Sequence, residues 1–195
     1  MIRFFDIIFS AVGLIVLSPL FLILLIIIKL DGKGGGFFTQ ERIGKNGVPF
    51  KLYKFRTMRQ NSDKEGLITV GGHDSRITKA GYFLRKYKLD ELPQLWNVLI
   101  GDMSLVGPRP EVEKYTKLYT EQQRKVLSVR PGITDWASIK YVDENVILGQ
   151  STDPDRAYID QIIPEKIRYN MIWIDNQSVT EYFKIIFMTL WSILR

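Results

Sequence analysis

Apolar and polar residues are distributed very unevenly along this chain of 195 residues. Residues 7–28, IIFSAVGLIVLSPLFLILLIII, form a run without a single charge, and about 20 apolar residues are enough for a helix to cross the hydrocarbon core of a bilayer. The Leu, Ile, Val and Phe side chains of this run favour insertion by about 5 to 10 kcal/mol in total. The pattern therefore predicts a membrane-embedded helix within residues 1–30.

Ser18-Pro19 interrupts this apolar run near its middle. Proline removes a backbone hydrogen bond and disfavours helical dihedrals at the preceding residue, so we expect a sharp bend. Each arm then measures about 17 Å, half the thickness of the hydrocarbon core. A re-entrant helix that dips and returns and a kinked helix that spans the bilayer both remain open. Arg3 on one side and Lys29 and Lys33 on the other mildly favour the cytoplasmic face for both ends.

A second apolar pattern lies in residues 179–195 at the C-terminal end of the chain. The pattern predicts an amphipathic helix with a thin polar strip, and either a membrane interface or the protein's own core can cover its apolar face. The apolar face consists of Phe183, Ile186, Phe187, Leu190, Trp191 and Leu194.

The middle of the chain predicts one α+β domain, mainly helical, over residues 31–195. Glycine-rich residues 31–36 predict a flexible hinge. Two apolar-aromatic runs on either side of Lys45-Asn46-Gly47 indicate a β-hairpin within residues 37–58. Helices are expected at 78–87 and at 91–100, where Asp90 would be the N-cap and Pro93 would lie in the first turn.

Composition limits the chemistry that this domain can perform. Lys and Arg number 27 against 21 Asp and Glu, and the resulting charge of +6 suits an anionic partner. The chain has no cysteine and a single histidine, His73, which excludes thiolate chemistry and a zinc site built on several histidines. A bound metal would need oxygen ligands, which favours Mg²⁺, with Mn²⁺ as the alternative.

The stretch KYKLDELPQLWN places the adjacent acids Asp90 and Glu91 among cations. Helix initiation and chemistry are both open explanations for this pair. Two other cations lie in rigid turns: Arg109 stands between two prolines and Arg130 precedes Pro131-Gly132. Fixed backbone dihedrals reduce the entropy lost when such a guanidinium binds a phosphate, although a plain surface turn is equally compatible.

Three long segments in order identify the chain as a member of a known family by resemblance. FTQERIGKNGVPFKLYKFRTM, DSRITKAGYFLRKYKLDELPQLWNVLIGDMSLVGPRP and VRPGIT resemble the bacterial sugar transferase family of monotopic phosphoglycosyl transferases, in its small form with a single catalytic domain. Such enzymes move a sugar-1-phosphate from a nucleoside diphosphate sugar, usually UDP-linked, to a polyprenol phosphate. The resemblance implies the first membrane step of polysaccharide or glycoconjugate synthesis.

The resemblance also implies roles for individual residues. Asp90 corresponds to the nucleophile that forms a phosphosugar-enzyme intermediate. Glu91 corresponds to a residue that helps to hold Mg²⁺, and Asp90 is expected to be a second ligand of the ion. The family's phosphate-binding cations correspond to Arg85, Arg109 and Lys54, and nucleotide or sugar contacts are expected from Arg76, Arg130 and Asp135. Ser18-Pro19 matches the break of a re-entrant membrane helix, which favours the dipping form.

The same resemblance implies partners and a location. We expect a UDP-sugar, a polyprenol phosphate such as undecaprenyl phosphate and the lipid bilayer as partners, but no nucleic acid; a homodimer stays open. The catalytic domain is expected on the cytoplasmic face of the bacterial inner membrane. Asp135-Trp136, where many members have glycine after GIT, and Asn170, in place of an expected aspartate, depart from the family pattern. The identity of the transferred sugar therefore cannot be inferred from the family.

Two competing interpretations use other features of the sequence. Asp153-Pro154-Asp155 resembles the metal-binding D-x-D of nucleotide-sugar glycosyltransferases, but it follows a polar loop and looks like a helix start. A membrane-anchored adaptor with a basic face that binds anionic lipids would explain the charge and the anchor. It would not explain two acids embedded among cations.

Overall fold

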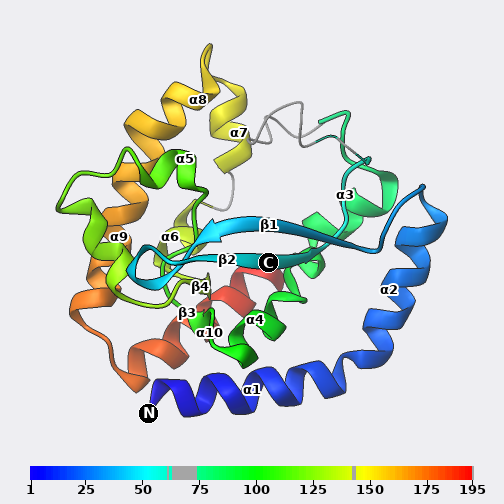
Figure 1. Cartoon of the computed structure of the whole chain (residues 1–195), viewed down its shortest axis with the longest axis horizontal. Coiled ribbons are helices and arrows are strands. Elements are labelled where there is room, and N and C mark those ends of the chain that lie inside the picture. The colour runs from blue at the N-terminus through cyan, green and yellow to red at the C-terminus, as the bar shows by residue number, and fades with distance from the viewer. Residues whose placement is uncertain (61, 63–73, 142–143, 195) are drawn as a thin grey trace.

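The computed structural model describes residues 1–60, 62, 74–141 and 144–194, and it has a mainly helical α+β fold. Two long N-terminal helices, α1 (Ile2–Val16) and α2 (Ser18–Leu30), run along two edges of the molecule. A hairpin of β1 (Phe37–Ile43) and β2 (Pro49–Phe55) crosses its middle, as Figure 1 shows. The predicted α+β class, mainly helical with a small hairpin, is confirmed for these residues.

The break between α1 and α2 lies where the sequence predicts it. The two helix axes differ by 60°, and the Ser18 hydroxyl donates a hydrogen bond of 2.8 Å to the carbonyl of Ile15, one turn before the break. This bond satisfies one acceptor that the proline leaves free. In the described part of the chain, no single helix is long and apolar enough to cross a membrane, and this bent pair alone has the required length and composition together.

Helix α1 is attached to the rest of the protein by a buried carboxylate. Asp6 is 1% exposed and accepts three hydrogen bonds of 2.9–3.0 Å, from the hydroxyls of Ser104 and Tyr182 and from the backbone N–H of Leu105. Arg3 donates to the carbonyls of Val98 and Leu99. These polar contacts fix the first half of α1 against the domain, which the apolar pattern alone did not indicate.

Helix α2 has an inner face that packs on the domain and an exposed outer face. Leu24 and Ile28 are 2% exposed and contact Phe55 of β2 and Leu84. The glycine-rich segment that follows, predicted as a flexible hinge, is bonded at several points. Arg56 donates to the carbonyls of Ile28, Gly32 and Lys33.

The hairpin has the predicted position and turn. Strands β1 and β2 pair in antiparallel register from Phe37 opposite Phe55 to Ile43 opposite Pro49. The connecting turn η1 (Lys45–Gly47) has Asn46 at a φ of 57°, in the left-handed region that asparagine adopts more readily than most residues. The hairpin carries Lys54 to the centre of the molecule.

The helix predicted at 78–87 is confirmed as α3 (Lys79–Lys86), with the Thr78 side chain as its N-cap. The helix predicted at 91–100 is shorter than expected. A 3₁₀ turn η3 (Leu89–Glu91) comes first, and α4 (Gln94–Ile100) begins only after Pro93, its N-cap residue. Asp90 therefore lies inside the 3₁₀ turn and not at a helix cap.

A second small sheet was not predicted. Strands β3 (Ser104–Val106) and β4 (Gly132–Thr134) form a parallel pair of only three residues each. Such strands are too short to show an alternating pattern in the sequence.

The remaining described elements are short helices and two longer ones. The chain contains α5 (Glu113–Thr116), η4 (Gln123–Ser128), α6 (Trp136–Lys140), α7 (Glu144–Gly149), α8 (Pro154–Ala157), the π-helical turn η5 (Tyr158–Ile162), α9 (Ile163–Asp175) and α10 (Val179–Leu194). Residues of α5, η4, α7, η5 and α9 share one apolar core. Helix α10 confirms the predicted C-terminal helix; it buries Tyr182 and Ile185 and exposes Phe187, Leu190 and Trp191, so one face packs on the core and another stays uncovered.

We predict that Asp6→Ala lowers the free energy of unfolding by about 3 kcal/mol, because three donors at a buried site lose a charged acceptor. Denaturation of the purified protein measures this loss. Asp175→Ala, which removes an exposed carboxylate at the end of α9, is the matched control and should change stability by less than about 0.5 kcal/mol. Equal stability of Asp6→Ala and the wild type would contradict the role of Asp6.

Candidate active site

A cavity of about 530 Å³ opens between the hairpin, the end of α3 and the turn η3. Its lining holds two acids, Asp90 and Glu91, among eight cations. This excess of positive charge suits a substrate with several phosphate charges. The cations are Arg42, Lys54, Arg56, Arg59, Arg76, Arg85, Lys88 and Arg109.

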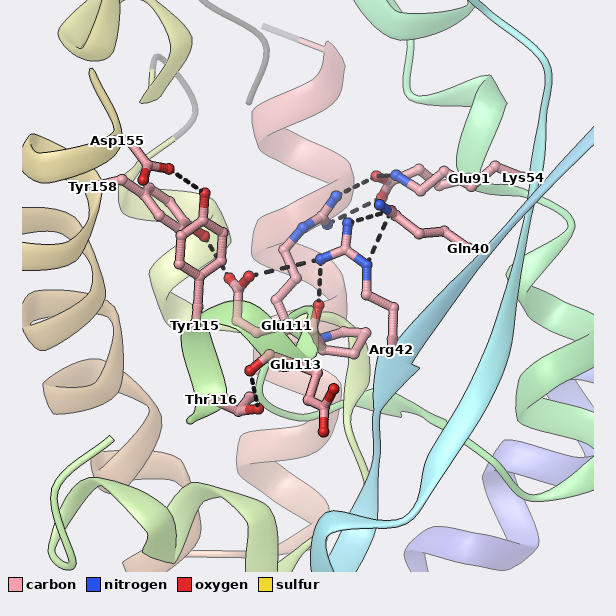
Figure 2. A network of polar contacts seen from close by, with 12 residues as sticks. Gln40, Arg42, Lys54, Glu91, Glu111, Glu113, Tyr115, Thr116, Asp155 and Tyr158 are labelled. Carbon is pink, nitrogen blue, oxygen red and sulfur yellow. Dashed lines mark hydrogen bonds and ion pairs between the residues drawn. The ribbon is translucent and has the colours of Figure 1, made fainter. Parts of the chain in front are cut away.

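Glu91 is the centre of an ion triad in this cavity. Lys54 Nζ lies 2.8 Å from Glu91 Oε1, and Arg109 Nη2 lies 2.5 Å from the same oxygen. Arg109 Nη1 donates to the other oxygen, Oε2, at 3.3 Å. Figure 2 shows Lys54 and Glu91 meeting at the edge of a larger polar network. Both oxygens of Glu91 are therefore occupied by cations.

The triad sets the charge states of its members. Burial alone would raise the pKa of Glu91, but the charges of Arg109 and Lys54 outweigh it and hold the pKa well below the ordinary value of 4.5. Burial lowers the pKa of Lys54, and the negative charge of Glu91 opposes that change. Glu91 thus stays ionised through the range in which ordinary glutamates take up a proton.

Asp90, beside Glu91, has a different environment. It is 6% exposed, and no residue in the described part of the chain donates a hydrogen bond to its carboxylate. Burial and the neighbouring charge of Glu91 raise the pKa of Asp90, while Lys54 and Arg85 act in the opposite direction. The expected N-cap role is wrong, because η3 turns this side chain into the cavity lining. Asp90 is left with free oxygens that face the cavity.

Arg109 is held by its backbone as well as by its side chain. Its N–H donates to Asp135 Oδ2 at 3.2 Å, and Asp135 Oδ1 accepts from the N–H of Ser138 as the N-cap of α6. Gly107 follows β3 and Gly132 begins β4. A Cβ on Gly132 would lie 2.1 Å from the backbone nitrogen of Gly107, so glycine is needed at this close contact. Asp135, which was predicted to contact nucleotide or sugar, is fully buried and outside the cavity lining, and its carboxylate holds the backbone of Arg109.

A network behind the cavity was not predicted from the sequence. Arg42 donates to the side chain of Gln40 and to the carbonyl of Pro110, and its guanidinium lies 3.6 Å from Glu111. Glu111 in turn accepts a hydrogen bond from the hydroxyl of Tyr158, in the π-helical turn. Figure 2 shows this chain of contacts leading from the hairpin to η5. Arg42 and Glu111 thereby brace the proline turn that carries Arg109.

Arg85 and Arg76 line the cavity, as their predicted roles require. Arg85 Nε donates to the Thr57 hydroxyl at 2.9 Å. This bond joins the end of α3 to the residues that follow β2. Arg76 pairs with Asp74 at 2.6 Å. Both guanidiniums are therefore held in place at the cavity before any ligand binds.

Two other segments named from the sequence lie outside this cavity. Arg130 does not reach this cavity, because its Nε donates to the carbonyl of Gly101 after the end of α4. Asp153 caps α8 by accepting the N–H of Arg156, and Asp155 pairs with Lys114 and Tyr115. The D-x-D segment is thus a helix start and not a metal site.

The two departures from the family pattern lie away from the cavity lining. Trp136 packs against the cluster around Val106 and Tyr182, and Lys184 lies over its ring at 5.3 Å. Asn170 is buried on α9, and no described residue bonds its Oδ1 atom. Neither supports an altered sugar contact in this cavity. His73 lies outside the described residues.

Comparison with known families agrees with this geometry. The family model described as bacterial sugar transferase matches residues 1–195. The chain therefore belongs to the bacterial sugar transferase family.

Named relatives extend the comparison. The chain is 37% identical over 197 residues to the UDP-N-acetylgalactosamine-undecaprenyl-phosphate N-acetylgalactosaminephosphotransferase of Aeromonas hydrophila, over 98% of this chain and 43% of the relative. It is 36% identical over 193 residues to the UDP-glucose:undecaprenyl-phosphate glucose-1-phosphate transferase of Klebsiella pneumoniae, over 97% of this chain and 39% of the relative. The chain thus spans about two fifths of the length of these two relatives.

A shorter relative is covered over a larger share of its length. The putative undecaprenyl-phosphate N-acetylgalactosaminyl 1-phosphate transferase of Bacillus subtilis is 44% identical over 120 residues, which covers 62% of this chain and 67% of the relative. The relatives' names differ in the sugar that they state, so these matches support a reaction class and not one sugar.

Proposed function

We propose that this protein transfers a sugar-1-phosphate from a UDP-sugar to a polyprenol phosphate and releases UMP. The observation that carries this proposal is the pair Asp90 and Glu91 in a cavity lined by eight cations. A nucleoside diphosphate sugar and a lipid phosphate are both anionic, and such a lining favours both. The names of the relatives from Aeromonas and Klebsiella support the same substrates.

Asp90 is the residue best suited to attack phosphorus. Its oxygens are free of hydrogen bonds from the described residues, whereas both oxygens of Glu91 are bonded to cations. In the first step an Asp90 oxygen bonds to the phosphorus that carries the sugar, and the bond from that phosphorus to the bridging oxygen breaks. UMP leaves with the bridging oxygen, and an aspartyl phosphosugar remains.

In the second step an oxygen of the polyprenol phosphate attacks the same phosphorus. The bond to Asp90 breaks, and the side chain returns to a carboxylate. Lys54, Arg85 and Arg109 supply positive charge beside the reacting phosphates throughout, in positions fixed before the reaction begins. Glu91 keeps Lys54 and Arg109 in place, and Asp135 holds the backbone of Arg109.

We also propose Mg²⁺, with Mn²⁺ as the alternative, as the cofactor. In the described part of the chain no group of three or more His, Asp or Glu side chains is close enough to hold a metal. Mg²⁺ commonly needs only one or two carboxylates and completes its shell with substrate phosphates and water. The oxygens of Asp90 would hold it, together with Glu91 Oε2, whose contact of 3.3 Å with Arg109 leaves a lone pair available. The ion would supply charge that offsets the diphosphate.

The bent pair α1–α2 supports a membrane role for this enzyme. We propose that it is a re-entrant helix in the inner membrane of a bacterium, with the catalytic domain on the cytoplasmic face, where a UDP-sugar and a lipid phosphate can meet. Exposed apolar side chains on both arms, Phe4, Val12, Ile15, Leu22, Ile26 and Leu30, are consistent with lipid contact. An adaptor without catalysis would have the same anchor but would not need Asp90 and Glu91 in a cationic cavity.

We predict that Asp90→Asn abolishes UMP release and that Glu91→Gln lowers it by at least a hundredfold. The first change removes the attacking oxygen's charge, and the second frees Lys54 and Arg109 from their anchor. The assay measures UMP from a panel of UDP-sugars with undecaprenyl phosphate and Mg²⁺. Glu113→Gln, which removes an exposed carboxylate, is the control and should keep wild-type activity. Full turnover by folded Asp90→Asn would sink the nucleophile assignment.

The raised pKa of Asp90 predicts the pH dependence. Because the attack needs the ionised carboxylate, activity falls as the pH drops through this pKa. Arg85 lowers the pKa of Asp90, so Arg85→Gln should move the acidic limb of the pH–rate profile to higher pH. Arg124→Gln, on exposed η4, should leave the limb in place. An unmoved limb in Arg85→Gln would show that Asp90 does not control it.

A further inference from the structure

A second cavity, of about 520 Å³, lies where α2 ends and α3 begins. Its volume falls in the range of small-molecule sites, and neither Asp90 nor Glu91 is among its lining residues. It is lined by Leu30, Asp31, Gly32, Lys33, Arg56, Met58, Arg59, Gln60, Ile77, Thr78 and Lys79.

The frame of this second cavity is fixed by polar contacts. Asp31 Oδ2 accepts the N–H of Ala80 at 2.8 Å and joins the end of α2 to the first turn of α3, which lie next to each other in Figure 1. Arg56, 9% exposed, donates to the carbonyls of Ile28 and Gly32 at 2.8 Å. The cavity is thus built into the fold where the membrane helix meets the domain.

The accessible charge of this cavity is positive. Asp31 and Arg56 are occupied by the contacts that form the frame, whereas Lys33, Arg59 and Lys79 are exposed. Ammonium and guanidinium groups are the usual protein partners of phosphate. The cavity is therefore suited to an anion with at least two charges.

An apolar surface leads directly to these cations. Leu22, Ile26 and Leu30 follow one another at intervals of four residues along α2, so they lie on one side of the helix. Their exposed fractions are 64%, 60% and 83%, and Leu30 also lines the cavity. A molecule that matches both features has a long apolar chain and a phosphate at its end.

We propose that the second cavity is the entry site for the acceptor, a polyprenol phosphate, with its chain along α2 and its phosphate near Lys33, Arg59 and Lys79. This inference rests on the proposed function. Four residues line both cavities, Arg56, Met58, Arg59 and Gln60, so the second cavity adjoins the one that holds Asp90. To reach the reacting phosphorus, the lipid phosphate would move past these four shared residues into the first cavity.

Direct binding tests the proposal without any requirement for catalysis. Undecaprenyl phosphate is titrated into the detergent-solubilised protein, and the rise in melting temperature gives an apparent Kd. We expect Lys33→Gln/Lys79→Gln to weaken binding at least fivefold. The control Lys45→Gln/Lys125→Gln, which removes two exposed cations on η1 and η4, should bind like the wild type. Equal binding by all three proteins would overturn the proposal.

Phosphatidylglycerol, titrated in the same way, separates the acceptor from bulk anionic lipid. A fivefold loss for undecaprenyl phosphate with no comparable loss for phosphatidylglycerol supports an acceptor site, and equal losses for both lipids would overturn it. UMP release by the wild type without acceptor reports on the proposed function separately. Its absence for every UDP-sugar would refute the proposed function, while the melting titration would still decide whether the cavity binds the lipid phosphate.

Discussion

The ion triad of Lys54, Glu91 and Arg109 joins three segments that are far apart in the sequence: the end of β2, the turn η3 and the proline turn after β3. The side chains of Lys54 and Glu91 are 19% and 12% exposed, so removing either one would leave the other charge without compensation, at a cost of up to about 3–5 kcal/mol. The constraint has a chemical consequence. It occupies both oxygens of Glu91 and leaves the adjacent Asp90 as the carboxylate with oxygens available to a substrate.

The same cavity is connected to the bent helix pair α1–α2 by a few polar groups. Arg56 bonds the backbone at the end of α2, and Asp6 bonds α1 to β3 and α10. Each polar side chain lies within or beside apolar packing, where an unpaired partner would be costly. Both arms of the bent pair are therefore docked on the domain, and the cationic cavities lie close to the end of α2.

Local patterns in the sequence were sufficient to predict some helices and strands but not others. The hairpin, α3, α10 and the break at Ser18-Pro19 follow from turn residues, caps and periodicity within one segment. The β3–β4 pair could not be predicted, since three-residue strands exist only through contacts between distant segments. The same limit applies at the site. Arg130 and Asp135 stand next to glycine and proline signals, but only the tertiary arrangement shows that they bond backbone groups outside the cavity. The sequence shows the cations near Asp90, but only the fold shows that burial and Glu91 raise its pKa.

In the proposed reaction Asp90, and not Glu91, forms the covalent bond to the phosphosugar. The most direct test is the intact mass of the protein after incubation with a UDP-sugar that it uses and Mg²⁺, without polyprenol phosphate. We expect a mass increase of one sugar phosphate, located by peptide mapping to Asp90 and removed when polyprenol phosphate is added. An unmodified protein that nevertheless transfers the sugar phosphate, or an adduct that persists in Asp90→Asn, would contradict it.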